Sequence, residues 1–259
     1  MPRRFAPFFT LIAIIAIAAC NATPAAPPIS DPKEILSRTV LSLKDVKTVD
    51  AKGELTGTFS MSGTSLDLKG TTMDFAADIP GKKFKASASV PAFLGTSAEA
   101  IFTDQALFYK VLGPAAAMVG ADPTGKYKKV ETPTPSGAAS PDVTDPQKAI
   151  DDFKAALDKL PTAPTKGANE KCGDQDCYHV TIKVTSDELK ALAPTSEANS
   201  FATSFTMSVD VWSRTNDLRP AKLALGVDAG TQGNATLTFT LSYDTGVSIA
   251  APPPDQIAP

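Results

Sequence analysis

Apolar and polar residues alternate strictly along the segment after residue 48. From Val49 to Met61 every second residue is apolar or glycine, and polar residues fill the positions between them. This period of two predicts a β-strand with one covered and one solvated face. We expect a second strand over 66–79, with a phase slip near 71–73 of the kind that a β-bulge produces. Strands over 84–90, 98–103 and 106–111 then complete a meander of about five antiparallel strands.

Two segments show helical spacing instead. Asp31-Pro32-Lys33-Glu34 combines an N-cap residue, a proline in the first turn and a glutamate at the third helical position, and apolar residues follow at helical spacing. We expect this helix to end at about Asp45. A second helix is expected to begin at Asp145-Pro146 and run to about Leu160, and a short third helix is expected over 186–192.

The alternation returns beyond the second helix, over 178–184, 205–212, 221–227 and 235–243. The sheet therefore continues past the helix, and one domain is expected rather than two. The predicted fold class is α+β, with a single strongly curved antiparallel sheet and its helices gathered on the apolar face. The segment 113–144 is rich in Ala, Pro, Gly and Ser, and we expect a loop there that is interrupted by a short strand at 126–130.

The N-terminus has the pattern of an export signal. Arg3 and Arg4 precede 15 apolar or small residues with one threonine, and Ile17-Ala18-Ala19-Cys20 follows as a lipobox. The apolar run is too short to span a membrane comfortably. We expect a lipoprotein signal peptide over 1–19 and an acylated Cys20. The alternatives are an ordinary secretory signal cut after Ala19 and a buried N-terminal helix.

The cysteine count agrees with a lipid anchor. The chain has three cysteines, and Cys172 and Cys177 are close enough in sequence to form a disulfide, which suits an oxidising exterior. Cys20 is then left for acylation. A diacylglycerol thioether on this cysteine provides the two acyl chains that stable anchoring needs. The expected location is the extracytoplasmic side of the cell membrane, with the chain anchored by lipid.

Charge and composition restrict the partners. Loss of residues 1–19 removes Arg3 and Arg4 and no acidic residue, so the net charge falls from −3 to −5. This mild acidity argues against nucleic acid as a partner. Prolines cluster near both termini, which marks 20–30 as a flexible tether and 254–259 as a C-terminal tail around a folded domain at 31–253. We expect a monomer without a cofactor.

The inward positions of the predicted sheet combine bulky side chains with very small ones. Close-packed helices would fill the space above the small residues and form an ordinary core, whereas helices held further away would leave an apolar cavity. The sequence leaves both arrangements open. The candidate cavity residues are Leu55, Gly57, Phe59, Leu68, Phe84, Ala86, Ala88, Phe102, Leu107, Tyr109, Phe153, Leu157 and Phe239.

The chain carries no recognisable catalytic pattern. His179 is the only histidine, it is expected on the face opposite Tyr178 and Val180, and we interpret it as an ordinary surface residue. Asp174 and Asp176 lie between the paired cysteines and fit a tight polar turn better than a calcium site, which needs six or more oxygens. Trp212 is expected either to anchor packing or to form a lip of the cavity. The chain is not expected to be an enzyme or to bind a metal.

Several short motifs resemble the LppX/LprG family of lipoproteins, in the order in which that family has them. They are Thr103–Lys110, which resembles an edge hairpin, Cys177–Thr181, Ser186–Leu189, Val209–Trp212, Leu218–Leu223 and Tyr243–Pro253. The resemblance implies a curved half-barrel sheet with helices over its concave side, similar to LolA and LolB. It also implies a hydrophobic cavity that accepts lipids or acylated glycolipids for transport, and it brings no catalytic residue. The alternative is a non-carrier structural or interaction lipoprotein with a filled core.

Overall fold

The computed structural model describes residues 28–61, 64–103, 106–131, 151, 155, 157–188 and 204–259. Cys20, the segment before it, most of the 145–160 helix, Phe153 and residues 132–150 lie outside this part of the chain, so the expectations for them stay predictions. The helices described from end to end are α2 (Pro32–Leu41) and α3 (Ala115–Met118), with 3₁₀ turns η2 (Pro91–Phe93), η4 (Gly230–Gln232) and η5 (Pro254–Gln256). Residues 157–159 and 186–188 are also helical.

Thirteen strands in the described residues form one sheet. They are β1 (Thr48–Met61), β2 (Thr64–Asp67), β3 (Thr71–Asp78), β4 (Lys83–Val90), β5 (Thr96–Thr103), β6 (Ala106–Leu112), β7 (Lys128–Glu131), β8 (Thr165–Lys166), β9 (Glu170–Cys172), β10 (Gln175–Thr185), β11 (Thr206–Arg214), β12 (Pro220–Asp228) and β13 (Gly233–Tyr243).

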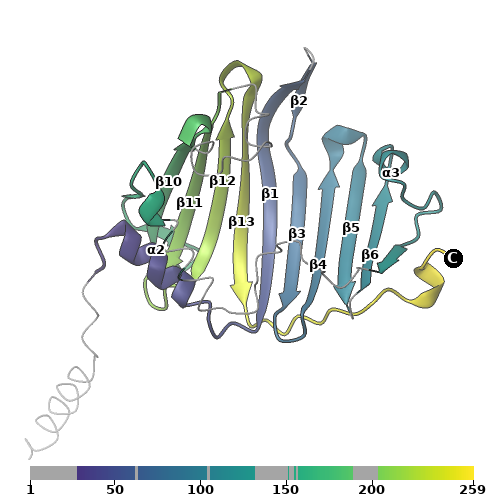
Figure 1. The fold of residues 1–259 in the computed structure, drawn as a ribbon, viewed down its shortest axis with the longest axis horizontal. Coiled ribbons are helices and arrows are strands. Elements are labelled where there is room, and N and C mark those ends of the chain that lie inside the picture. Colours follow the sequence, from purple (N-terminus) through teal and green to yellow (C-terminus); the bar gives the residue numbers. More distant parts are fainter. Residues whose placement is uncertain are drawn as a thin grey trace, which may run out of the picture. The chain divides into compact units, whose positions relative to one another are not determined.

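The sheet is antiparallel and open. Its order is β7-β6-β5-β4-β3-β1-β13-β12-β11-β10-β8, with β2 paired to β1 and β9 paired to β10 (Figure 1). Because β1 pairs with β13 along almost its whole length, the N-terminal meander and the C-terminal strands form one continuous surface. The predicted single antiparallel sheet of an α+β fold is therefore confirmed. The hairpin of Thr103–Lys110 is not the edge, because β7 pairs outside β6.

The predicted second strand is divided in two, and this part of the prediction was wrong in detail. Asp67 lies opposite Thr58 and Thr71 lies opposite Leu55, so one extra residue is inserted on the β2–β3 side. The phase slip exists, but it lies at 68–70, a few residues earlier than expected. Gly70 has a φ of +80°, a value that glycine adopts without strain, and this allows the strand to be interrupted between β2 and β3.

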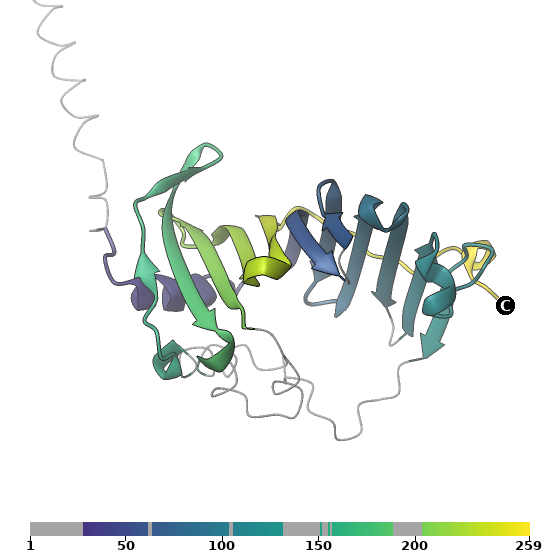
Figure 2. The ribbon, with the colours of Figure 1, turned by 90° about the horizontal axis from the view of Figure 1, so that it is seen from above.

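The helix α2 lies against one face of β10 and β11 (Figure 2). Asp31 caps its N-terminus, accepting a hydrogen bond from the Lys33 amide at 3.0 Å, as predicted. The helix ends at Leu41 instead of about Asp45. From Leu43 on the amides bond three residues back rather than four, as in the bond from the Val46 amide to the Leu43 carbonyl at 3.1 Å, so residues 42–45 form tight turns.

The hydroxyls of Thr39 in α2 and Ser213 in β11 lie 2.6 Å apart, so α2 is fixed to the face that we call the inner face. Ile35 and Leu36 of the helix are buried there beside Val180 of β10. The expectation that helices pack on the apolar face is confirmed for α2. This helix covers the β10–β11 end, whereas α3 follows β6 at the other half of the sheet.

Residues 244–259 form what we call the C-terminal strap, which runs along the lower ends of the strands from β13 to β7 (Figure 1). Asp244 begins it by accepting the Lys47 amide at 2.9 Å. Tyr127 holds its far end, since the Tyr127 amide donates to the Gln256 carbonyl and its carbonyl accepts the Ala258 amide, both at 2.8 Å.

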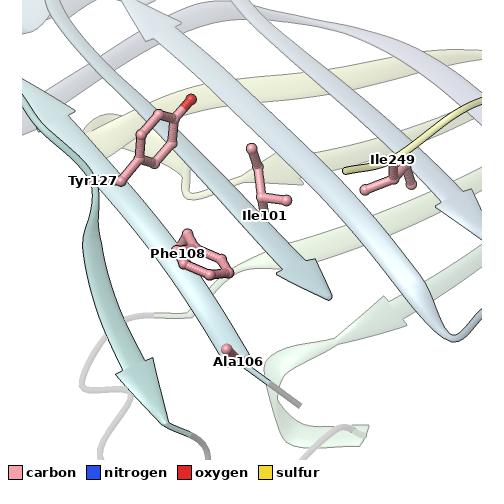
Figure 3. Packing of buried hydrophobic residues seen from close by; sticks show 5 residues of the cluster. All are labelled: Ile101, Ala106, Phe108, Tyr127 and Ile249. Carbon is pink, nitrogen blue, oxygen red and sulfur yellow. The ribbon is translucent and has the colours of Figure 1, made fainter. Parts of the chain in front are cut away.

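The strap covers part of the outer face of β5 and β6. Ile101 and Phe108, on neighbouring strands, are buried beneath it together with Tyr127 and Ile249 (Figure 3). The solvated outer face predicted for Val49–Met61 does not extend to β5 and β6. Their sequences show uninterrupted apolar runs rather than alternation, which is typical of strands buried on both faces.

Candidate functional site

The inner face is apolar from β10 to β6 because alternating side chains meet in register. Leu55 lies opposite Leu237, Leu237 opposite Leu225, and Gly53 opposite Phe239. A Cβ built on Gly53 would lie 2.6 Å from the Phe239 ring. The space above this glycine is therefore filled by an aromatic ring, and here the small residue serves ordinary packing.

The small residues of β4 and β5 behave differently. Ala86 pairs with Ala100, and Ala88 pairs with Ala98, so four methyl groups lie side by side across two strands. An open groove of 390 Å³ lies over them. Its volume falls in the range of roughly 300–1,000 Å³ that small-molecule sites occupy.

Larger side chains surround the alanine floor. The residues that line the groove are Met73, Asp74, Phe75, Ala86, Ser87, Ala88, Ala98, Glu99, Ala100, Tyr109, Val111 and Phe239. Phe84 and Phe102 lie on the same face, next to the Ala86–Ala100 pair along the strands, and stack at a ring distance of 5.1 Å without lining the groove. Phe75 remains 39% exposed, which is unusual for a phenylalanine on the covered side of a sheet.

The polar side chains near the groove face away from it. Asp74, Ser87 and Glu99 occupy alternate positions to the inward residues of their strands, so they contribute backbone to the wall and project to the outer face. Tyr109 therefore supplies the one hydroxyl among the inward side chains of the described groove wall. A surface of this kind can hold an apolar group by excluding water, and Tyr109 offers a single hydroxyl for a polar contact.

The structure brings most of the predicted cavity residues onto one face but only some of them into the groove. Ala86, Ala88, Tyr109 and Phe239 line it. Leu55, Gly57, Phe59, Phe84, Phe102 and Leu107 lie on the same face by register, Leu68 is buried at the β2–β3 break, and Leu157 is buried elsewhere in the fold. Phe153 lies outside the described residues.

Five inward groove residues were not among the cavity candidates of the sequence analysis, namely Met73, Phe75, Ala98, Ala100 and Val111. Met73 and Phe75 follow the phase slip, and a slip of one residue exchanges the two faces of a strand. Only the observed position of the extra residue at 68–70 assigns them to the inner face. Val111 of β6 lies on the inner face because it pairs with Ala98 of β5.

A charged cluster lies behind the groove, on the outer face. The Glu99 carboxylate accepts a hydrogen bond from the Tyr127 hydroxyl at 2.6 Å and pairs with the Lys85 ammonium at 2.9 Å. Burial, the largest single influence, raises the pKa of Glu99, but the Tyr127 hydroxyl and Lys85 together outweigh it, so the pKa lies below its usual value. The ionised Glu99 thereby fixes Tyr127, which holds the C-terminal strap.

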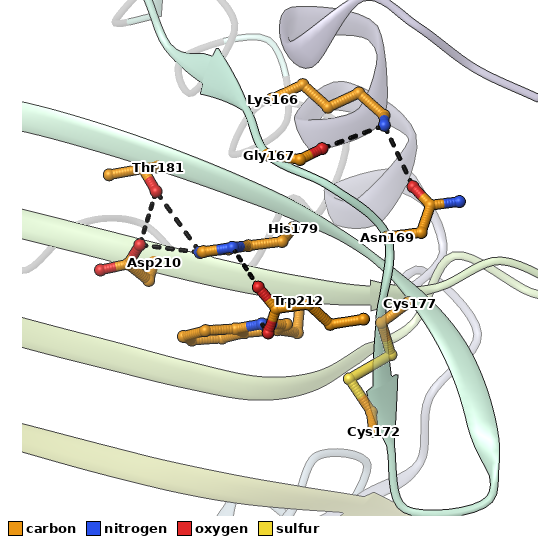
Figure 4. A network of polar contacts seen from close by, with 10 residues as sticks. Lys166, Gly167, Asn169, Cys172, Cys177, His179, Thr181, Asp210 and Trp212 are labelled. Carbon is orange, nitrogen blue, oxygen red and sulfur yellow. Dashed lines mark hydrogen bonds and ion pairs between the residues drawn. A yellow bond between two sulfur atoms is a disulfide. The ribbon is translucent and has the colours of Figure 1, made fainter.

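His179 lies on the outer face, opposite Tyr178 and Val180, as predicted. It is more enclosed than an ordinary surface histidine, because its ring stacks on Trp212 with centroids 4.4 Å apart. Its Nδ1 lies 2.9 Å from Glu170 and its Nε2 lies 2.8 Å from Asp210 (Figure 4). The Trp212 indole donates to Glu170 at 2.8 Å, which is the main cause that lowers the pKa of Glu170. Trp212 is therefore a packing residue and not a lip of the groove.

The predicted disulfide between Cys172 and Cys177 is confirmed. It closes the β9–β10 hairpin, in which Cys172 pairs with Gln175 and Cys177 with Glu170. The bridge lies beside Trp212 and Ala224, so it belongs to the packed outer face and not to the groove. No helix in the part of the chain that the structure describes combines the length and apolarity needed to cross a membrane.

No protein-family model matches the chain, and no curated protein matches it in sequence. Solved structures do match. Lipoprotein LppX from Mycobacterium tuberculosis has 11% identity and a TM-score of 0.48, over 85% of this chain and 98% of that chain. LprF from Mycobacterium bovis has 15% identity and a TM-score of 0.46, over 88% of this chain and 99% of that chain.

A LolA superfamily protein from Nitrosomonas europaea matches at 10% identity and a TM-score of 0.26, over 88% of this chain and 96% of that chain. LppX and LprF carry the names of the family to which the sequence motifs are similar. The chain is similar to these solved structures of the lipoproteins LppX and LprF and of a LolA superfamily protein.

Proposed function

We propose that the chain is a lipoprotein that binds a lipid or an acylated glycolipid in the groove over β4 and β5. In this proposal an acylated Cys20 anchors it on the extracytoplasmic side of the cell membrane, and the protein carries its ligand across the cell envelope. The observation that supports the proposal is the open apolar groove of 390 Å³. Its floor of four alanines leaves room that the described part of the protein does not fill.

The chemistry of the wall supports an acyl chain as the ligand. Exposing an acyl chain to water costs about 0.8 kcal/mol for each methylene group, whereas a transfer from a bilayer to an apolar groove exchanges one dry environment for another. Such a transfer needs no external energy source. The inward side chains of the described wall offer no carboxylate or amine, so they suit binding rather than a reaction on the ligand.

The test is native mass spectrometry of the full chain, purified from membranes in a mild detergent. We expect a population whose mass exceeds that of the anchored protein by the mass of one or more lipids. Ala88→Phe would place a ring in the groove and should abolish that population. The matched control is Ser89→Phe, one residue further on the same strand, which projects an aromatic side chain from the other face.

The proposal requires that Ser89→Phe retains the lipid and Ala88→Phe loses it, while both variants unfold at nearly the wild-type temperature. A filled core predicts another pattern. Ala88→Phe would then overpack the interior and cost about 1–3 kcal/mol of unfolding free energy. That destabilisation, together with the absence of any bound lipid in the wild type, would overturn the proposal in favour of a structural lipoprotein.

A further inference from the structure

Five apolar side chains are exposed at one end of the β4–β6 part of the sheet. They are Phe93 (51% exposed), Leu94 (81%), Leu112 (43%), Met118 (88%) and Val119 (54%). We call this set the apolar rim. Single exposed apolar residues are common on proteins, but a cluster of them marks a surface that contacts something other than water.

The strand order brings these residues together. β4 ends and β5 begins at the turn that carries Phe93 and Leu94, and β6 ends at Leu112 at the same end of the sheet (Figure 1). The two turns are in contact, since a Cβ added to Gly113 would lie 3.0 Å from the Thr96 Cα. The helix α3, which ends in Met118, starts directly after this contact.

The backbone holds the rim in a defined conformation. Leu94 adopts a φ of 52°, in the left-handed region that leucine rarely occupies. The turn is closed by a hydrogen bond from the Gly95 amide to the Pro91 carbonyl at 3.2 Å and one from the Thr96 hydroxyl to the Phe93 carbonyl at 2.6 Å. An unfavourable conformation that displays an apolar side chain to solvent is typical of a functional position.

We propose that the apolar rim inserts into the interface of a lipid bilayer. Five side chains are few beside the roughly 20–30 residues a side of a stable protein interface, and they protrude from turns instead of forming a shaped surface. A bilayer accepts protruding apolar groups without shape complementarity. The Lys128 ammonium donates to the Gly120 carbonyl at 3.0 Å, so a positive charge lies beside Val119 of the rim, where anionic headgroups would attract it.

The rim also lies near one end of the groove. Of the two alanine pairs in the groove floor, Ala88 and Ala98 are the pair nearer the rim. Val111 lines the groove from the inner face, and the next residue, Leu112, pairs with Ser97 on the outer face at the end of β6. An inserted rim would therefore bring the groove to the bilayer surface. Insertion is a property of the rim alone, and it does not depend on what the groove binds.

The test places a tryptophan in the rim of the full chain, with Leu94→Trp as the probe. The matched control is Ile79→Trp. Ile79 is also an exposed apolar residue (51%), but it directly follows β3 and lies at the end of the sheet opposite the rim. Each variant is bound to vesicles of phosphatidylcholine and phosphatidylglycerol whose acyl chains carry bromine, which quenches tryptophan only at contact depth. Trp212 is common to both variants and supplies the background emission.

We expect brominated vesicles to quench the Leu94→Trp emission strongly and to leave the Ile79→Trp emission at the level of unbrominated vesicles. In the Cys20→Ala background, which removes the proposed acyl anchor, replacing Leu94 and Met118 by serine should also weaken vesicle partitioning by about tenfold for each side chain, since each loses a leucine-sized apolar contact. Equal quenching in both variants, or no quenching in either while the protein sediments with the vesicles, would overturn the proposal. In the second case a protein partner would be the occupant of the rim.

Discussion

Replacing Ile249 by alanine tests whether the C-terminal strap is part of the hydrophobic core. Ile249 is only 6% exposed and packs on Ile101, Phe108 and Tyr127 of the outer face. Removing three carbon atoms from such a site ordinarily costs about 2–5 kcal/mol, depending on how well the surroundings close around the gap. Because the strap is a single segment lying on a sheet, it can settle inward, and we expect about 2–3 kcal/mol.

The assay is urea unfolding of the full chain, followed by circular dichroism and analysed with a common m-value. In a domain of this size the expected loss corresponds to a melting temperature lower by about 5–10 °C. The control is Ile79→Ala, because Ile79 is 51% exposed and its truncation should change stability by less than about 0.5 kcal/mol.

A strap that is only loosely attached would give another result. Ile249→Ala would then be no more destabilising than Ile79→Ala, and hydrogen exchange at the Ala258 amide would be as fast as in an unstructured peptide. That outcome would refute the claim that the outer face of β5 and β6 is buried by residues 244–259.

Three further predictions concern the rest of the sheet. Gly57→Ala should strongly destabilise the pairing of β1 with β13, because Gly57 has a φ of +115° and an added Cβ would collide with the backbone of β13. The expected result is a lower melting temperature than that of the wild type. Reducing the Cys172–Cys177 disulfide should cost about 2 kcal/mol in the chain-entropy model, and melting with and without dithiothreitol measures it. The lowered pKa of Glu170 means that its ionised form stabilises the fold above its ordinary pKa of about 4.3 and that this stability is lost as the pH falls through the lowered value. Trp212 emission should therefore change on that acidic side, and Glu170→Gln should remove this change.

Most of the fold could be predicted from the alternation of apolar and polar residues along the strands. Because a strand with one wet face must alternate, Val49–Met61 and residues 235–243 could be placed, and their inward side chains assigned, from sequence. The same rule failed where a strand is buried on both faces, as at Ile101 and Phe108. The apolar run there was visible, but the partner that covers it is a proline-rich tail without any period.

The groove was harder to predict than the sheet. A small inward residue means filled space at Gly53, where the Phe239 ring lies, and open space at Ala88. The difference depends on which side chain lies opposite, and hence on the register between strands. This register cannot be read from the sequence. The extra residue at 68–70 shifts the register of β3, and with it the face on which Met73 and Phe75 lie.

The rim illustrates a third case. Phe93 and Leu94 are separated from Met118 by two strands; they lie between two predicted strands, whereas Met118 lies in the predicted loop at 113–144. Only the antiparallel order of β4, β5 and β6 places them at one end. A surface made of several turns has no periodic signal along the chain, so it becomes visible only in the folded protein.

The most direct test of the account is a crystal structure of the protein grown with a fatty acid that carries bromine at the end of its chain. The anomalous signal of bromine locates the acyl chain without any assumption about its path. We predict a bromine peak on the inner face of the sheet, above the alanines Ala86, Ala88, Ala98 and Ala100. A groove that stays free of bromine at saturating ligand, or a peak confined to the outer face, would contradict the claim that this groove is where the protein holds lipid.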